Sequence, residues 1–150
     1  MKTVRIYIET SFQRPTVRDG KYASALVFTG TDGDHELIVT GSEKVTTYNR
    51  LTLLGAVAAM KRLNQRCNVI MTMDNYYVAN MITQGNPEKW RRSEWKKAAG
   101  TQVQNKDLWE MFLTEKDKQE LVVEYSSCSE YSGKRQYSRH GEAVQRRHSK

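Results

Sequence analysis

The sequence predicts an α/β domain in which a mixed sheet carries helices on its faces. Three observations predict this class. Apolar runs with strand periodicity come first, a long segment with helical periodicity follows, and a continuous apolar run then leads into further helical segments and a last strand. Because 150 residues suffice for one compact core, we expect a single domain over residues 1–150, with a basic tail from about residue 134.

The N-terminal third has the pattern of an antiparallel meander. Residues 4–9, VRIYIE, place apolar side chains at alternate positions, which is the period of a strand. A polar loop follows over residues 11–20. Residues 21–30 and 35–42 then have strand character and are separated by the turn-forming sequence TGTDGD. We therefore expect three consecutive antiparallel strands.

The middle of the chain predicts a helix followed by a buried strand. Apolar side chains recur at helical spacing within residues 46–66, and Thr46 or Thr47 can serve as the N-cap. The apolar run 67–73 is too continuous for a half-exposed edge strand. We expect this strand to be central and parallel to the first.

Helical and strand patterns alternate through the rest of the chain. Residues 75–84 and 107–118 have helical spacing, and residues 119–126 have the pattern of a fifth strand. The residues of the second of these helices that we expect to face inward are Leu108, Met111 and Phe112. Together these elements complete a mixed sheet whose ligands are expected at the carboxyl ends of its central strands.

The charge of the chain favours a polyanionic partner. Its formal charge is +7, with 24 basic and 17 acidic residues and a pI near 9.5. Because each phosphate that a protein neutralises releases counterions, nucleic acid is the first candidate and an acidic membrane surface the second. No apolar run approaches the ~18 residues that span a bilayer, and the N-terminus is charged too early for a secretory signal. We expect a cytoplasmic monomer that does not enter a membrane.

Two acidic residues end two of the predicted strands. Glu9 follows the first strand and Asp74 follows the fourth. If these strands are neighbours, the two carboxylates lie close together, and they then need a shared proton or a cation. Either acid alone could be an end-of-strand cap. On adjacent strands of a basic protein, the pair favours a cation site.

The order and spacing of several segments resemble the type 1 ribonuclease H family of bacteria. The segments TTYNRLTLLGAVAAMKRL, CNVIMTMDNYYV and KWRRSEWKKAAGTQVQNKDLW carry the likeness, which spans residues 4 to about 125. The resemblance implies a ribonuclease H-like fold with a five-stranded sheet in the order 3-2-1-4-5. It also implies two Mg²⁺ ions, held by four carboxylates, which act in cleavage of the RNA strand of an RNA/DNA hybrid.

Only part of the implied metal-binding set is present. The family's first carboxylate position falls on Glu9, one methylene longer than the family's Asp, and the third falls on Asp74. The second falls on the uncharged Thr52, and the fourth falls near Arg139 unless Glu142 substitutes for it. Because Mg²⁺ demands near-ideal octahedral geometry from hard oxygen ligands, we expect weak or absent Mg²⁺ or Mn²⁺ binding at this remnant site.

The positions that bind nucleic acid in the family are better preserved. The resemblance places Thr47 and Asn105 where family members bind a phosphate of the DNA strand. The segment that corresponds to the family's basic protrusion contains Trp90, Arg91, Arg92, Trp95, Lys96 and Lys97. The tryptophans could instead be packing residues, and the cations an ordinary solvated face. The family's glycine-rich loop after the first strand is replaced by SFQRPTVRDG, which has bulky side chains and two arginines.

These observations lead to one hypothesis and two alternatives. The leading hypothesis is a ribonuclease H-like protein that binds an RNA/DNA hybrid or a duplex through phosphate contacts and has lost, or nearly lost, catalysis. The first alternative is an active metal-dependent hybrid endoribonuclease with rearranged carboxylates. The second is a scaffold for a protein partner in a replication or mobile-element complex. The basic tail is expected to add an auxiliary phosphate contact.

Overall fold

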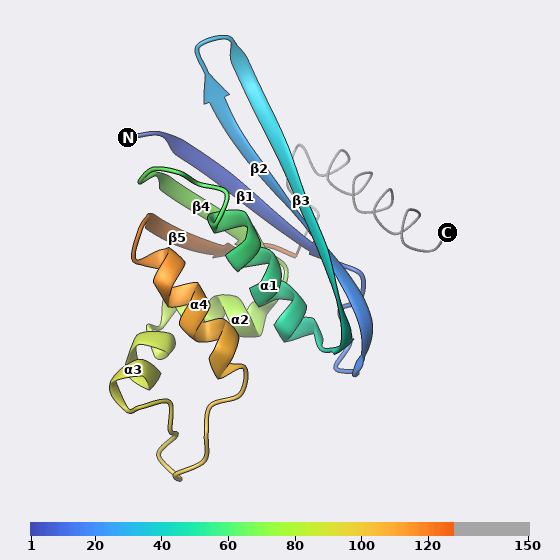
Figure 1. Ribbon diagram of the computed structural model, residues 1–150, viewed down its shortest axis with the longest axis vertical. Coiled ribbons are helices and arrows are strands. Elements are labelled where there is room, and N and C mark those ends of the chain that lie inside the picture. Colours follow the sequence, from blue (N-terminus) through green and yellow to red (C-terminus); the bar gives the residue numbers. More distant parts are fainter. Residues whose placement is uncertain (128–150) are drawn as a thin grey trace.

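The computed structural model describes residues 1–127, which form a five-stranded sheet with helices packed against it (Figure 1). The predicted substitute ligand Glu142 and the basic tail lie outside these residues. In chain order the elements are β1 (Thr3–Thr10), β2 (Arg18–Gly30), β3 (Gly33–Thr46), α1 (Tyr48–Met60), β4 (Asn68–Met73), α2 (Tyr76–Thr83), α3 (Asn86–Arg92), α4 (Lys106–Lys116) and β5 (Glu120–Tyr125).

The order of strands in the sheet is β3-β2-β1-β4-β5, which confirms the expected topology. β1 is antiparallel to β2 and parallel to β4, and β5 is parallel to β4. β2 and β3 extend beyond the predicted residues 21–30 and 35–42, because a hairpin pairs its backbones even where the side chains are polar. Their joined tip projects from the rest of the molecule (Figure 1).

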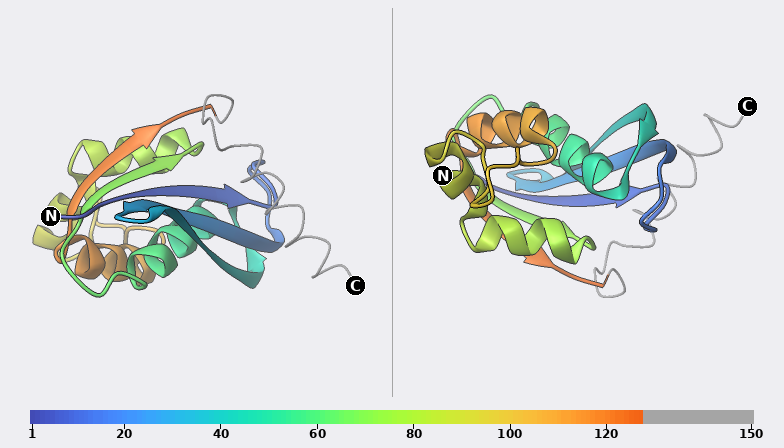
Figure 2. Two further views of the ribbon diagram at one scale, coloured as in Figure 1. Left: turned by 90° about the horizontal axis from the view of Figure 1, so that it is seen from above. Right: turned by 90° about the horizontal axis from the view of Figure 1, so that it is seen from below.

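One face of the sheet packs against helices. The β1 side chains Val4, Ile6 and Ile8 are buried, as are alternate residues of β4. α1 and α4 lie side by side over this core (Figure 2). α1 approaches the sheet closely at Gly55, whose carbonyl oxygen accepts a hydrogen bond of 2.9 Å from Ser24 Oγ. A Cβ atom at Gly55 would lie 2.9 Å from Ile8 Cγ2, closer than side chains pack.

Three local predictions were wrong. α1 ends at Met60 instead of continuing to residue 66, because the chain must turn back to start β4 beside β1. Met111 is 38% exposed, since the buried stripe of α4 passes through Trp109 instead. α3 was not expected, although Pro87 in its first turn favours the start of a helix. Among the helices of residues 1–127, none is both long enough and apolar enough to cross a membrane.

Candidate functional site

The predicted acidic pair lies where β1 and β4 end. The parallel register pairs Tyr7 with Thr72. Glu9 lies two residues beyond Tyr7 in β1, and Asp74 directly follows the end of β4. The structure therefore places both residues at the carboxyl ends of two adjacent parallel strands, where α/β sheets bind ligands.

A tyrosine occupies one oxygen of the Asp74 carboxylate. The Tyr48 hydroxyl donates a hydrogen bond of 2.6 Å to Asp74 Oδ1. Tyr48 is the first residue of α1, so the start of this helix is tied to the end of β4. Such a bond to a charged acceptor is stronger than one between neutral groups. Sequence reasoning missed Tyr48, which directly follows the predicted N-cap residue Thr47.

Thr52 belongs to a neutral hydrogen-bond network below this pair. Its side chain is buried, and its hydroxyl donates to the Tyr48 carbonyl oxygen at 3.0 Å. The same oxygen accepts from Asn75 Nδ2 at 3.2 Å, and Asn75 Nδ2 also donates to Asn49 Oδ1 at 2.9 Å. Asn75 Oδ1 caps α2 by accepting from the Val78 amide at 3.1 Å. Every one of these buried groups has a partner, so the network is stable without a charge or a metal.

The described side chains do not fit a two-metal centre. Within residues 1–127, no group of three or more His, Cys, Asp or Glu side chains is placed to hold a metal ion. One oxygen of Asp74 accepts a hydrogen bond from a phenol, and Thr52 offers a neutral hydroxyl that already donates one hydrogen bond and accepts another. Since Mg²⁺ prefers carboxylate oxygens and water, this donor set is too poor in charge to hold two such ions.

The two predicted phosphate-binding residues are positioned by Arg50. Thr47 is the N-cap of α1, and its side-chain oxygen accepts from the Arg50 amide at 3.2 Å. Asn105 precedes α4 in a left-handed conformation with φ of 61°, and its Oδ1 accepts from Arg50 Nη1 at 3.2 Å. With these acceptors occupied, the Thr47 hydroxyl proton and Asn105 Nδ2 remain as donors. Two donors held at helix N-termini suit an anionic ligand.

Arg50 is itself neutralised by two acids. Its guanidinium contacts Asp107 through two bonds of 3.0 Å and Glu43 through a further bond of 3.0 Å. These hydrogen bonds, first that to Asp107 and then that to Glu43, raise the pKa of Arg50. The hydrogen bond from Arg50 in turn lowers the pKa of each acid. The Arg50 side chain thus orients Asn105, the Arg50 backbone amide holds the Thr47 cap, and the guanidinium charge is not available to a ligand.

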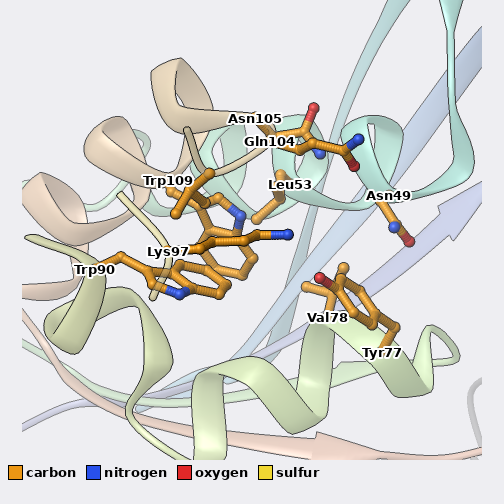
Figure 3. Close-up of a pocket in the computed structure, with 10 residues that line it drawn as sticks. Asn49, Leu53, Tyr77, Val78, Trp90, Lys97, Gln104, Asn105 and Trp109 are labelled. Carbon is orange, nitrogen blue, oxygen red and sulfur yellow. The ribbon is translucent and has the colours of Figure 1, made fainter. Parts of the chain in front are cut away.

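A shallow pocket adjoins Asn105 between α1, α2 and α4 (Figure 3). Trp90 packs edge-to-face against Trp109, with ring centroids 5.6 Å apart, and Lys97 lies beside them on the same wall. The lining residues are Asn49, Leu53, Tyr77, Val78, Trp90, Lys97, Val103, Gln104, Asn105 and Trp109. Its volume of about 20 Å³ is enough for roughly one water molecule, which excludes a small-molecule substrate site.

Sequence reasoning missed three polar residues of this pocket, Asn49, Tyr77 and Gln104. A signal for two of them was available in the chain. Asn49 lies two residues after Thr47, and Gln104 directly precedes Asn105. Figure 3 shows both side chains among those that line the pocket, and the amide nitrogen of each can donate hydrogen bonds.

The residues of the predicted protrusion have different surroundings. Trp90 and Lys97 reach the pocket, whereas Trp95 is only 6% exposed and belongs to the hydrophobic core. Arg91 forms an ion pair of 3.3 Å with Asp117. The remaining two predicted cations, Arg92 and Lys96, are exposed. Trp95 therefore supports the protrusion from within, and the exposed cations provide its surface charge.

Comparison with known proteins places this arrangement in a family. The RNase H family model matches residues 1–130. The chain belongs to the ribonuclease H family. It is 36% identical over 110 residues to the ribonuclease H of Acetivibrio thermocellus, covering 73% of this chain and 71% of that protein. To a ribonuclease H of Thermus thermophilus it is 37% identical over 94 residues, covering 63% of this chain and 54% of that protein. The match thus spans little more than half of the second relative.

Solved structures confirm the ribonuclease H-like fold. LC9-RNase H1, described as a type 1 RNase H with the type 2 active-site motif, superposes with a TM-score of 0.76 over 93% of this chain and 69% of that chain, at 20% identity. A foamy viral protease-reverse transcriptase solved with an RNA/DNA hybrid gives a TM-score of 0.64 at 10% identity, over 87% of this chain and 18% of that chain. Ribonucleases H bind RNA/DNA hybrids, and enzymes of the family typically use Mg²⁺.

Proposed function

We propose that this ribonuclease H homologue binds an RNA/DNA hybrid or a duplex through phosphate contacts, and that it cleaves the hybrid very weakly or not at all. The observation that carries the binding part is the pair of donors on Thr47, which caps α1, and Asn105, which the Arg50 side chain orients. The Thr47 hydroxyl and the Asn105 amide each have their acceptor oxygen occupied and a donor left over. This polarity suits a phosphate oxygen and does not suit a cation.

The protrusion supplies charge next to these donors. Lys97 lies in the pocket that Asn105 also lines, and Arg92 and Lys96 are exposed. Among the ion pairs of residues 1–127, none includes Lys96, Lys97 or Arg92. Arg91 contributes less, because Asp117 already neutralises part of its charge. In this proposal Trp90 offers an apolar face to the backbone sugars, and Trp95 only supports it.

The loss of cleavage rests on the hydrogen bonds around Thr52 and Asp74. A hydroxyl with both of its roles filled cannot act as an anionic ligand, and the hydrogen bond from Tyr48 competes for Asp74. Glu9 and Asp74 then remain as a remnant site that holds Mg²⁺ or Mn²⁺ weakly, if at all. The contribution of Glu142 is part of the test below.

Binding is tested with a fluorescently labelled RNA/DNA hybrid by anisotropy over a series of salt concentrations. The variant carries Arg91→Gln, Arg92→Gln, Lys96→Gln and Lys97→Gln together. We expect about 100-fold weaker binding and a salt slope lower by about 3, because each lost phosphate contact removes roughly one unit of slope. Absence of binding by the unchanged protein at low salt would reject the proposal and favour the protein-scaffold alternative.

A matched control removes the same charge elsewhere. The substitutions Lys61→Gln, Arg62→Gln, Arg66→Gln and Lys118→Gln lie at the opposite ends of α1 and α4. This variant is expected to bind within about threefold of the unchanged protein, since distant exposed charges are screened. An equal loss in both variants would show that binding follows net charge alone.

Cleavage is tested separately with the same hybrid in Mg²⁺ and in Mn²⁺. We expect no product at protein concentrations that saturate binding. Product that forms and disappears in Asp74→Asn would overturn the inactive part of the proposal. That outcome would favour the alternative of an active endoribonuclease, in which Glu142→Gln should then also abolish product if Glu142 replaces the missing carboxylate.

A further inference from the structure

A second polar cleft lies between the β1–β2 loop, the start of β2 and the end of β3. Its volume is about 470 Å³, more than twentyfold that of the pocket beside Asn105. The residues that line it are Ser11, Arg18, Asp19, Gly20, Lys21, Ser42, Glu43 and Lys44. No residue that the resemblance assigned to metal or nucleic-acid binding is among them.

Positive charge predominates in this cleft. Arg18, Lys21 and Lys44 take part in none of the ion pairs found within residues 1–127. The two acids of the cleft are both engaged elsewhere. Asp19 Oδ1 accepts from the Val45 amide at 2.9 Å, and the Glu43 carboxylate is paired with Arg50. The cations of the cleft are therefore available to an anionic ligand, whereas Glu43 shares Arg50 with Asp107.

The loop that forms one wall is held in place by its own hydrogen bonds. The Ser11 amide donates to the Lys21 carbonyl oxygen at 2.9 Å, and the Lys21 amide donates to Ser11 Oγ at 2.9 Å. Thr10 Oγ1 donates to the Phe12 carbonyl oxygen at 3.0 Å. The Arg18 guanidinium lies 5.5 Å from the centroid of the buried Phe12 ring, at which distance it is attracted to the ring. These contacts fix the backbone that carries Arg18 and Lys21.

We propose that this cleft binds a phosphate group of a nucleic-acid strand, as a site separate from Thr47 and Asn105. Three cations and the hydroxyls of Ser11 and Ser42 are the groups that bind phosphate oxygens. They would repel a metal ion, and the polar lining does not suit an apolar ligand.

The position of the cleft supports a strand that runs past both sites. Lys44 lies three residues before Thr47, so the Cα atoms of the two residues are at most about 10 Å apart. A single nucleic-acid molecule can therefore contact the cleft and the donors of Thr47 and Asn105 together. The inference rests on the proposed function, because it assumes that the protein binds nucleic acid. It adds a second anchor on the far side of α1 from the protrusion.

The test is a variant with Arg18→Gln, Lys21→Gln and Lys44→Gln, assayed with the same labelled hybrid and salt series. We expect about 30-fold weaker binding and a salt slope lower by about 2. The control variant Lys61→Gln, Arg62→Gln, Arg66→Gln removes equal charge and is expected to change the affinity less than threefold. Circular dichroism confirms that both are folded. If the triple variant does not fold, the exposed single substitution Lys44→Glu is expected to weaken binding about tenfold.

The outcomes separate this inference from the proposed function. If the protrusion variant loses affinity and the cleft variant does not, the cleft inference is wrong and the proposed function stands. If the unchanged protein fails to bind at low salt, the proposed function is wrong and takes the inference with it. Inorganic phosphate, titrated in an amide NMR experiment, distinguishes the source of the anion. Shifts of Ser11 and Lys21 with no effect of the triple variant on hybrid affinity would mean a site for free anions, which overturns the inference.

Discussion

Two regions at the first turn of α1 use hydrogen bonds in opposite ways. Around Asp74 and Thr52, polar side chains bond mainly to one another, through Tyr48 and Asn75. Around Arg50, the internal bonds occupy acceptors and leave donors facing outward from Thr47 and Asn105. In the first region the hydrogen bonds join polar groups of the protein to one another, whereas the second leaves donors that the proposed function assigns to an anion.

The difference shows that binding and chemistry place separate demands on one fold. Two-metal chemistry needs a set of charges at fixed positions, and one neutral residue in the set is enough to weaken it. Phosphate binding needs only correctly directed donors and nearby cations, which several residues share. A ribonuclease H fold can therefore keep the second property while losing the first.

Restoring the missing carboxylate should destabilise the protein. Thr52 is 1% exposed, so Thr52→Glu places a charge among neutral partners and is expected to lower the free energy of unfolding by about 3 kcal/mol. Urea unfolding without divalent ions measures the loss. Because the new charge is next to Asp74, added Mg²⁺ should return part of the stability in this variant. The control Thr52→Gln has the same shape without the charge and should not respond to Mg²⁺; a response of equal size would contradict the explanation.

Removing the Arg50 side chain, which orients Asn105, should lower the free energy of unfolding by less than Thr52→Glu does. Arg50→Met breaks the bonds to Glu43, Asn105 and Asp107, and we expect the free energy of unfolding to fall by about 2 kcal/mol. Affinity for the hybrid should fall as well, because Asn105 loses the contact that orients it.

The same variant changes the dependence of stability on pH. The pKa values of Glu43 and Asp107 are lowered in the folded protein from ordinary values of 4.5 and 3.8. Their contribution is complete above those values and is lost as the pH falls through the folded pKa values. Between pH 6 and pH 3, the free energy of unfolding should decrease less for Arg50→Met than for the unchanged protein. An identical decrease in both proteins would mean that the pairs of Arg50 with Glu43 and Asp107 do not contribute to stability.

Replacing the amide donor of Asn105 by a charged acceptor should weaken hybrid binding moderately. Asn105→Asp replaces Nδ2 by a charged oxygen opposite the expected phosphate, and we expect about tenfold weaker binding of the hybrid. Asn105→Ala only removes the donor and should cost about threefold. The two titrations are compared at one salt concentration. If both variants bind equally, the charge at this position does not face a phosphate.

Removing the charge of the strand-end acid should have the smallest effect on binding. In Asp74→Asn, an amide oxygen can still accept the hydrogen bond from Tyr48. We expect hybrid affinity within about twofold of the unchanged protein, because the Asp74 carboxylate does not donate a hydrogen bond to a phosphate oxygen. A tenfold change in hybrid affinity in the same anisotropy assay would show that the regions around Asp74 and around Arg50 are coupled.

The sequence predicted most of the sheet and the positions of its acids, because alternating apolar residues and chain order determine both. The parallel pairing of β1 with β4 places Glu9 and Asp74 at the ends of neighbouring strands. The sequence did not predict the bond between Tyr48 and Asp74, whose partners are 26 residues apart and meet only through packing. The large cleft was missed for a related reason, since its walls depend on how the β1–β2 loop folds against β3.

The close approach at Gly55 has a consequence for both regions. Both sites include residues from the first turn of α1, so both depend on how deeply that helix lies against the sheet. Because Gly55 has no side chain, α1 packs directly against Ser24 and Ile8, and these contacts fix how close the helix lies to the sheet. A methyl group there would lift the helix and displace Thr47 and Thr52 together. The glycine in the middle of α1 therefore sets the positions of Thr47 and Thr52 at the same time.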